Sequence, residues 1–142
     1  PTGMNESLRA IKKLGGIYLL FVLNDRIPDG TDVSWIWDVD IETLINKDFH
    51  AFVSGDRAYD MGLRLKYARK WQMANSPRGE AGDKPARYAS QRIAAGCQIE
   101  EHLEDALRNS LMATPEGETL YVLPTYSAML NVRKILTGRK IL

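Results

Sequence analysis

The sequence feature that most constrains the fold is an uninterrupted hydrophobic run over residues 17–23, IYLLFVL. Successive side chains of a strand point to opposite faces of a sheet, so a run without polar positions is buried on both faces. This pattern is typical of an interior strand in a parallel sheet that helices cover on both sides. The run is far shorter than the roughly 20 apolar residues of a membrane-spanning helix.

The rest of the chain alternates between helical and strand patterns. Strands are expected at residues 49–54 and 119–123, with a very short one at residues 97–99. Helices are expected at residues 5–14, 41–45, 55–71, 86–95, 100–112 and 126–136. In the 100–112 helix, the spacing places Leu103, Ala106, Leu107 and Leu111 in the core. This order predicts an α/β fold, a Rossmann-like three-layer domain with a mostly parallel sheet.

Length and composition indicate one domain over residues 1–142, with ordinary values of 44% hydrophobic and 26% charged residues. Residues 73–96 combine proline, glycine and many polar residues, and we expect a mobile insertion there. The chain lacks an initiator methionine, so we interpret it as a fragment of a longer protein. Its one cysteine, Cys97, excludes an internal disulfide and a multi-cysteine zinc site, and indicates a cytoplasmic protein.

Charges are segregated along the chain although the net charge is only +1. Residues 24–48 hold seven acids and two bases, and residues 57–92 hold nine bases and three acids. Such segregation can steer charged partners, or can reflect solvated faces of mixed sign. Because no recognisable nucleic-acid-binding module accompanies the basic stretch, no nucleic-acid partner is expected.

The common catalytic and phosphate-binding motifs are absent from the sequence. There is no glycine-rich dinucleotide or P-loop motif and no nucleophile elbow. His50 and His102 lie far apart without ligand-like neighbours, so no metal site is expected. Cys97 is interpreted as a small buried residue rather than a nucleophile.

Three loops should leave the carboxyl ends of the predicted strands, where ligands of α/β proteins usually bind. They begin at Asn24, at residues 54–57 and at residues 123–126. They form either a functional rim or a set of ordinary turns and helix caps, and the residues alone leave both open.

The first of these loops holds four carboxylates and two tryptophans within residues 23–38. A carboxylate at a strand end can orient a histidine, accept a proton or hold a metal. Tryptophans could anchor such a loop, and the alternative is an anchored loop whose surface acids are incidental.

The segment at residues 29–42, DGTDVSWIWDVDIE, resembles a signature of the MurT family, specifically its Mur-ligase-type C-terminal domain. Further blocks of similar character lie at residues 1–5, 23–25, 54–58, 63–68 and 123–130. The resemblance covers nearly the whole chain, except that residues 73–96 are longer than the family pattern suggests.

The resemblance implies the synthetase subunit of a glutamine-dependent, ATP-dependent ligase. With ammonia from a GatD-like glutaminase partner, such an enzyme amidates the D-glutamate of the lipid II stem peptide to D-isoglutamine. It would work at the cytoplasmic face of the membrane, touching it only through lipid II. ATP, Mg²⁺ and zinc would bind mainly on other domains, so this segment alone should be inactive and bind no cofactor.

The resemblance also implies roles for individual residues. Asp32 would complete the partner's Cys–His site, with Asp29 and Asp38 as rivals in the same loop. Trp35 and Trp37 would support the loop or lie at the partner interface, where Asp29 and Asp38 would also lie. The candidates for substrate binding are Asn24, Arg57 and Tyr126. Helix capping or packing is their alternative role. The alternative function is a non-catalytic docking or lid domain of a Mur-like ligase that binds an amino acid substrate.

Overall fold

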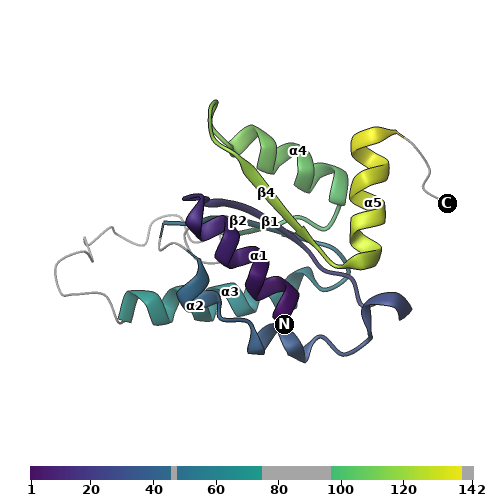
Figure 1. The fold of residues 1–142 in the computed structure, drawn as a ribbon. Coiled ribbons are helices and arrows are strands. Elements are labelled where there is room, and N and C mark those ends of the chain that lie inside the picture. Colours follow the sequence, from purple (N-terminus) through teal and green to yellow (C-terminus); the bar gives the residue numbers. More distant parts are fainter. Residues whose placement is uncertain (46–47, 75–96, 139–142) are drawn as a thin grey trace, which may run out of the picture.

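The computed structural model describes residues 1–45, 48–74 and 97–138 (Figure 1). Its described strands form one sheet in the order β3-β2-β1-β4, and every pairing is parallel. The strands are β1 (Tyr18–Val22), β2 (His50–Ser54), β3 (Cys97–Ile99) and β4 (Leu120–Pro124). The hydrophobic run therefore forms an interior strand, as predicted.

Helices cover both faces of the sheet (Figure 1). One face is covered by α1 (Thr2–Lys13), α2 (Ile41–Leu44) and α3 (Ala58–Ala74), and the other by α4 (Leu103–Ala113) and α5 (Tyr126–Thr137). This confirms the predicted α/β fold with three layers. Between β1 and α2 the chain forms two short 3₁₀ helices, η1 (Ile27–Asp29) and η2 (Ser34–Asp38).

The two sides of β1 belong to two different hydrophobic clusters. Leu19, Phe21 and Leu23 pack in the cluster beneath α1, α2 and α3. Leu20 and Val22 pack with residues of α4 and α5. Each of these five side chains is at most 1% exposed, which explains why the run tolerates no polar position.

The structure corrects parts of the sequence-based assignment. Leu111, predicted in the core, is 64% exposed, and Ser110 is buried instead. Leu103, Ala106, Leu107 and Ser110 share one helical face, whereas Leu111 lies about 100° further round from Ser110. The helix predicted at residues 86–95 and most of the insertion predicted at 73–96 lie outside the described residues. Residues 73–74 are the end of α3.

Among the described residues, no helix combines the length and apolar character that a membrane span would require.

Candidate functional site at the carboxyl edge of the sheet

The three loops selected from the sequence leave the same edge of the sheet. In the strand register, Val22 lies level with Ser54 on one side and with Pro124 on the other. The chain runs from β1 toward β2, and later returns to place β4 on the opposite side of β1. The carboxyl edge between β1 and β4 is therefore the point where ligands of open parallel sheets usually bind.

Asn24 joins all three loops at this point and is only 4% exposed. Its backbone N–H donates to Thr125 Oγ1 at 3.1 Å. Its side-chain Nδ2 donates to Ser127 Oγ at 3.2 Å, and its Oδ1 accepts from the backbone N–H of Asp56 at 3.1 Å. The carboxamide proposed for substrate binding thus makes internal cross-links, and its binding role stays a prediction.

Gly55 allows the second loop to approach the first. Its φ of +98° lies in the region that favours glycine, and a Cβ there would stand 2.4 Å from the carbonyl oxygen of Leu23. The same Cβ would be 2.9 Å from Asn24 Oδ1. Only glycine fits this crossing without displacing the loops.

Arg57 and Tyr126, the other candidates for substrate binding, differ in their surroundings. The Arg57 side chain donates to Asp25 Oδ2 at 2.8 Å and, more weakly, to Asp60 at 3.5 Å. Tyr126 is 59% exposed at the start of α5. It borders a hollow of about 610 Å³ between β4, α1 and η1, together with Asp29 and Trp35. Neither predicted role is tested by this geometry.

Asp29 binds within the chain, at the start of α5. Its Oδ1 accepts from the backbone N–H of Ser127 at 2.8 Å, and its Oδ2 accepts from the Ser127 hydroxyl. A carboxylate is favoured at this position because the first N–H groups of a helix lack helical partners and carry partial positive charge. Asp29 therefore ties η1 to α5, and this geometry does not test its predicted place at a partner interface.

Asp32 lies on the exposed span between η1 and η2. Its Oδ1 accepts from the backbone N–H of Ser34 at 2.8 Å. That hydrogen bond, with a smaller effect of the Ser34 hydroxyl, lowers the pKa of the Asp32 carboxyl. The side chain is thus held in a local turn, ionised at neutral pH, and open to solvent.

Arg64 of α3 fixes the end of this loop at η2 and is only 4% exposed. Its Nε donates to the carbonyl of Ile36 at 3.0 Å, and its Nη2 donates to the carbonyl of Val39 at 2.7 Å. Glu42 completes the set of acceptors, and the hydrogen bond from Arg64 lowers the pKa of its carboxyl. Asp32 therefore lies between two segments that are fixed to the rest of the domain: η1, through Asp29, and η2, through Arg64.

The two tryptophans of the loop have different surroundings. Trp35 is partly buried and packs against the core. Trp37 is 50% exposed, lies edge-on to the Tyr67 ring with centroids 5.9 Å apart, and has the Arg64 guanidinium 5.5 Å from its ring. Asp38 is exposed on η2. The expectation that tryptophans anchor the loop fits Trp35, and the interface roles of all three stay predictions.

Sequence reasoning missed Arg64 and Ser127. Arg64 follows Met61 by three residues and precedes Ala68 by four, so it lies on the buried face of α3. A charged residue on an apolar helix face was a signal that it has buried partners. No comparable signal distinguished Ser127, because its partners Asp29 and Asn24 lie about 100 residues earlier.

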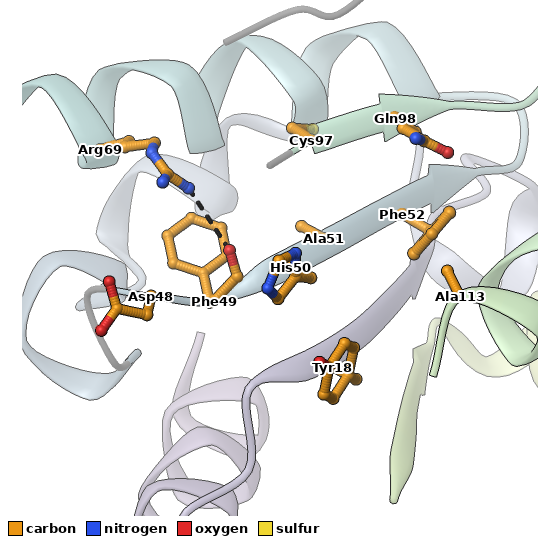
Figure 2. A pocket seen from close by; sticks show the side chains of 10 residues that line it. All are labelled: Tyr18, Asp48, Phe49, His50, Ala51, Phe52, Arg69, Cys97, Gln98 and Ala113. Atoms are coloured by element: carbon orange, nitrogen blue, oxygen red, sulfur yellow. Dashed lines mark hydrogen bonds between the residues drawn. The ribbon is translucent and has the colours of Figure 1, made fainter. Parts of the chain in front are cut away.

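A second hollow, of about 410 Å³, lies at the opposite edge, where β1, β2 and β3 begin (Figure 2). There the rings of Tyr18 and His50 stack with centroids 5.0 Å apart, and Arg69 donates to the carbonyl of Phe49 at 3.3 Å. Burial raises the pKa of the Cys97 thiol to about 11. A thiol with this pKa is a poor nucleophile at neutral pH, which agrees with the interpretation of Cys97 as a small buried residue.

The described residues provide no cluster of three or more His, Cys, Asp or Glu side chains that could hold a metal ion. With one cysteine in the chain, a four-cysteine zinc site does not fit this segment. The sequence also lacks the glycine-rich loop with which many proteins cradle nucleotide phosphates.

Comparison with known proteins gives consistent matches. The family model described as MurT ligase C-terminal matches residues 1–129. The lipid II isoglutaminyl synthase (glutamine-hydrolyzing) subunit MurT of Streptococcus pneumoniae (strain ATCC BAA-255 / R6) is 27% identical over 143 positions, which cover 99% of this chain and 27% of that protein. The proteins of the same name from Staphylococcus aureus strains COL and N315 are each 45% identical over 71 residues, 48% of this chain and 16% of theirs.

The chain thus spans about a quarter or less of the length of these relatives. Its parallel sheet with helices on both faces agrees with a Rossmann-like domain of the Mur ligase C-terminal type. The family match covers most of the chain, including every loop at the carboxyl edge. On these grounds the chain belongs to the MurT ligase C-terminal family.

Proposed function

We propose that this domain completes the active site of a GatD-like glutaminase subunit through Asp32. The whole enzyme would be a lipid II isoglutaminyl synthase, which amidates the D-glutamate of the lipid II stem peptide with ammonia released from glutamine. The proposal follows the names of the relatives, which describe a glutamine-hydrolyzing synthase subunit. It places the protein in the cytoplasm at the inner membrane face, where lipid II would bring the substrate.

The observation that carries the proposal is the presentation of Asp32. Its carboxylate is exposed, its pKa is lowered by the Ser34 N–H, and its loop is anchored on both sides. A group that orients a partner's imidazole must be ionised and accessible, and must be held in place before the partner arrives. Asp29 meets these requirements less well, because Ser127 already occupies both of its oxygens.

In the proposed mechanism, a carboxylate receives a hydrogen bond from the histidine of the partner. The partner's cysteine thiolate attacks the amide carbon of glutamine, and the imidazolium gives its proton to the departing ammonia. Water then hydrolyses the thioester and regenerates the thiolate. Asp32 would fix the tautomer of the imidazole and stabilise its cationic form, without itself taking up the proton.

Activation of the substrate carboxylate would take place elsewhere in the longer protein. ATP with Mg²⁺ would supply that activation, bound mainly on domains outside this chain. The residues of this domain would contribute by closing over the substrate, and the exposed Tyr126 at the rim is one candidate for that contact.

The test is glutamine hydrolysis by the assembled complex of the full-length subunit and its glutaminase partner. Asp32→Asn removes the charge and keeps the shape, and we expect turnover to fall by roughly 100-fold or more. Glu116→Gln, an exposed carboxylate in a distant turn, is the matched control and should leave turnover unchanged.

Complex formation must be measured in the same samples. Unchanged turnover of the intact Asp32→Asn complex would remove Asp32 from catalysis and favour a docking or lid domain. A large loss in Asp38→Asn instead would move the proposed role to that rival.

A further inference from the structure

We propose that an exposed strip of four side chains on α3 and η2 is the surface on which the glutaminase subunit docks. The α3 strip consists of Tyr59, Leu63, Tyr67 and Trp37, which are 61%, 45%, 54% and 50% exposed. The inference rests on the proposed function, because it assumes that Asp32 points toward that subunit.

The α3 strip is continuous along one side of the helix. Tyr59, Leu63 and Tyr67 follow one another at intervals of four residues, so they lie on neighbouring turns of one helix face and span about 12 Å. Trp37 extends the strip onto η2, where its ring meets Tyr67 edge-on at 5.9 Å with an interplanar angle of 60°. The result is one apolar surface made from two segments about 30 residues apart.

One end of the α3 strip, at Trp37, is held in place by contacts within this chain. The buried guanidinium of Arg64 bonds to the carbonyls of Ile36 and Val39 and also lies 5.5 Å from the Trp37 ring. Trp37 is therefore held against α3 by the same side chain that fixes η2. A surface ordered in advance loses little conformational entropy on binding, which favours its use as a docking site.

Aromatic side chains of this kind are frequent at binding hot spots, because they bury a large area and lose few rotamers. Exposed apolar residues occur elsewhere in the described chain, including Leu111 and Met112 on α4. Those two lie on α4, in the helix layer opposite α3. They therefore serve as controls.

The charges near the α3 strip, and its connection through η2 to the segment that holds Asp32, indicate which partner would bind there. Trp37 and Asp32 belong to the same short segment, which also carries the exposed carboxylates of Asp38 and Asp40. A second copy of this chain, placed face to face, would bring like charges together, which is unfavourable. The expected partner instead has an apolar centre bordered by basic groups, one of them the histidine that Asp32 would orient.

The first experiment measures the affinity of the full-length subunit for its glutaminase partner. The double variant Leu63→Ser/Tyr67→Ser should raise the dissociation constant by roughly 30-fold or more, as expected for hot-spot residues. Leu111→Ser/Met112→Ser makes the same kind of change on α4 and should leave it within about twofold. An unchanged constant for the α3 variant would overturn the proposal.

The second experiment does not require a disruptive substitution. Leu63→Cys and, separately, Leu111→Cys are alkylated in the full-length subunit with a maleimide, and each labelled peptide is quantified by mass spectrometry. Cys97 is buried with a raised pKa and should contribute little background. Adding the glutaminase should slow labelling at position 63 at least about tenfold and leave position 111 unchanged.

If something other than the glutaminase covers the α3 strip, the labelling experiment gives a different result. Protection of position 63 in the free, monomeric subunit would show that the same chain covers the strip, and protection that accompanies a doubled mass would indicate a second copy. Either result overturns the proposal. Loss of binding in the α3 variant with normal turnover in the Asp32→Asn complex would support the docking surface and reject the catalytic role of Asp32.

Discussion

The guanidinium of Arg64 grips both carboxylate oxygens of Glu42, with Nη1 2.6 Å from Oε1 and Nη2 2.8 Å from Oε2. Arg64 belongs to α3 and Glu42 to α2, and the same guanidinium also bonds to the carbonyl of Ile36 in η2. One buried side chain therefore joins three elements. The conformation of the loop that presents Asp32 therefore depends on a buried cation from α3 as well as on the loop's own residues.

Arg64→Lys should destabilise the protein although it keeps the charge. A lysine ammonium cannot reproduce the planar fork, so the carbonyls of Ile36 and Val39 would lose donors in a buried place. We expect the free energy of unfolding to fall by about 2–4 kcal/mol. Urea denaturation measures this change, and Arg108→Lys, which alters an exposed pair with Asp105, should cost less than about 0.5 kcal/mol. Equal losses in the two variants would contradict the central role of Arg64.

The pair also predicts a pH dependence. The hydrogen bond from Arg64 lowers the folded-state pKa of Glu42 below its ordinary value of 4.5. Its stabilisation is therefore fully present above pH 4.5 and is lost as the pH falls through the lower folded-state value. The difference in free energy of unfolding between wild type and Glu42→Gln should be constant from pH 6 to 7 and shrink below about pH 4.5. A difference that grew on acidification would show that the sign is wrong.

The fold was predictable because its main signal is local. The run at residues 17–23 has no polar position, and both faces of β1 are buried in the structure. The parallel sheet and the shared edge of three loops followed from the order of the elements. Leu111 was misplaced because leucine at the margin of a helix face fits the periodicity as well as Ser110 does, and only the packed neighbours decide between them.

The site was predictable only in its outline. The acidic, tryptophan-containing loop was visible as a composition, but which carboxylate stays free depends on contacts far away in the sequence. Asp29 bonds to Ser127, 98 residues later, and Asp25 bonds to Arg57, 32 residues later. These pairings leave two exposed carboxylates of the loop, Asp38 and Asp32, and Asp32 is held by its own turn.

Gly55→Ala should be among the most destabilising small substitutions in the chain. The new Cβ would stand 2.4 Å from the Leu23 carbonyl, at a backbone φ of +98° that alanine rarely adopts. The expected loss in free energy of unfolding is about 3 kcal/mol or more. Gly117→Ala is the control, since its φ is +87° with open space around it, and it should cost only about 1 kcal/mol. Similar losses would mean that the loops shift and relieve the clash.

The bond between Asp29 and Ser127 should be measurable as a coupling energy. Asp29→Ala removes a carboxylate from the start of α5, and we expect a loss in free energy of unfolding of about 1–2 kcal/mol. Ser127→Ala removes the hydroxyl that donates to Asp29, and it also removes the acceptor of the Asn24 side chain. Because each single variant includes other effects, the double variant is required.

In that cycle the two losses should not add, and the coupling should be about 1 kcal/mol, as a charge-assisted hydrogen bond supplies. The backbone N–H of Ser127 also bonds to Asp29, and it remains in Ser127→Ala, so part of the Asp29 contribution should survive in that background. Thermal denaturation of the four proteins provides the measurement. Strictly additive losses would show that the hydroxyl bond between Ser127 and Asp29 contributes nothing to stability. A negligible loss in Asp29→Ala itself would show that η1 is not fixed to α5 at this point.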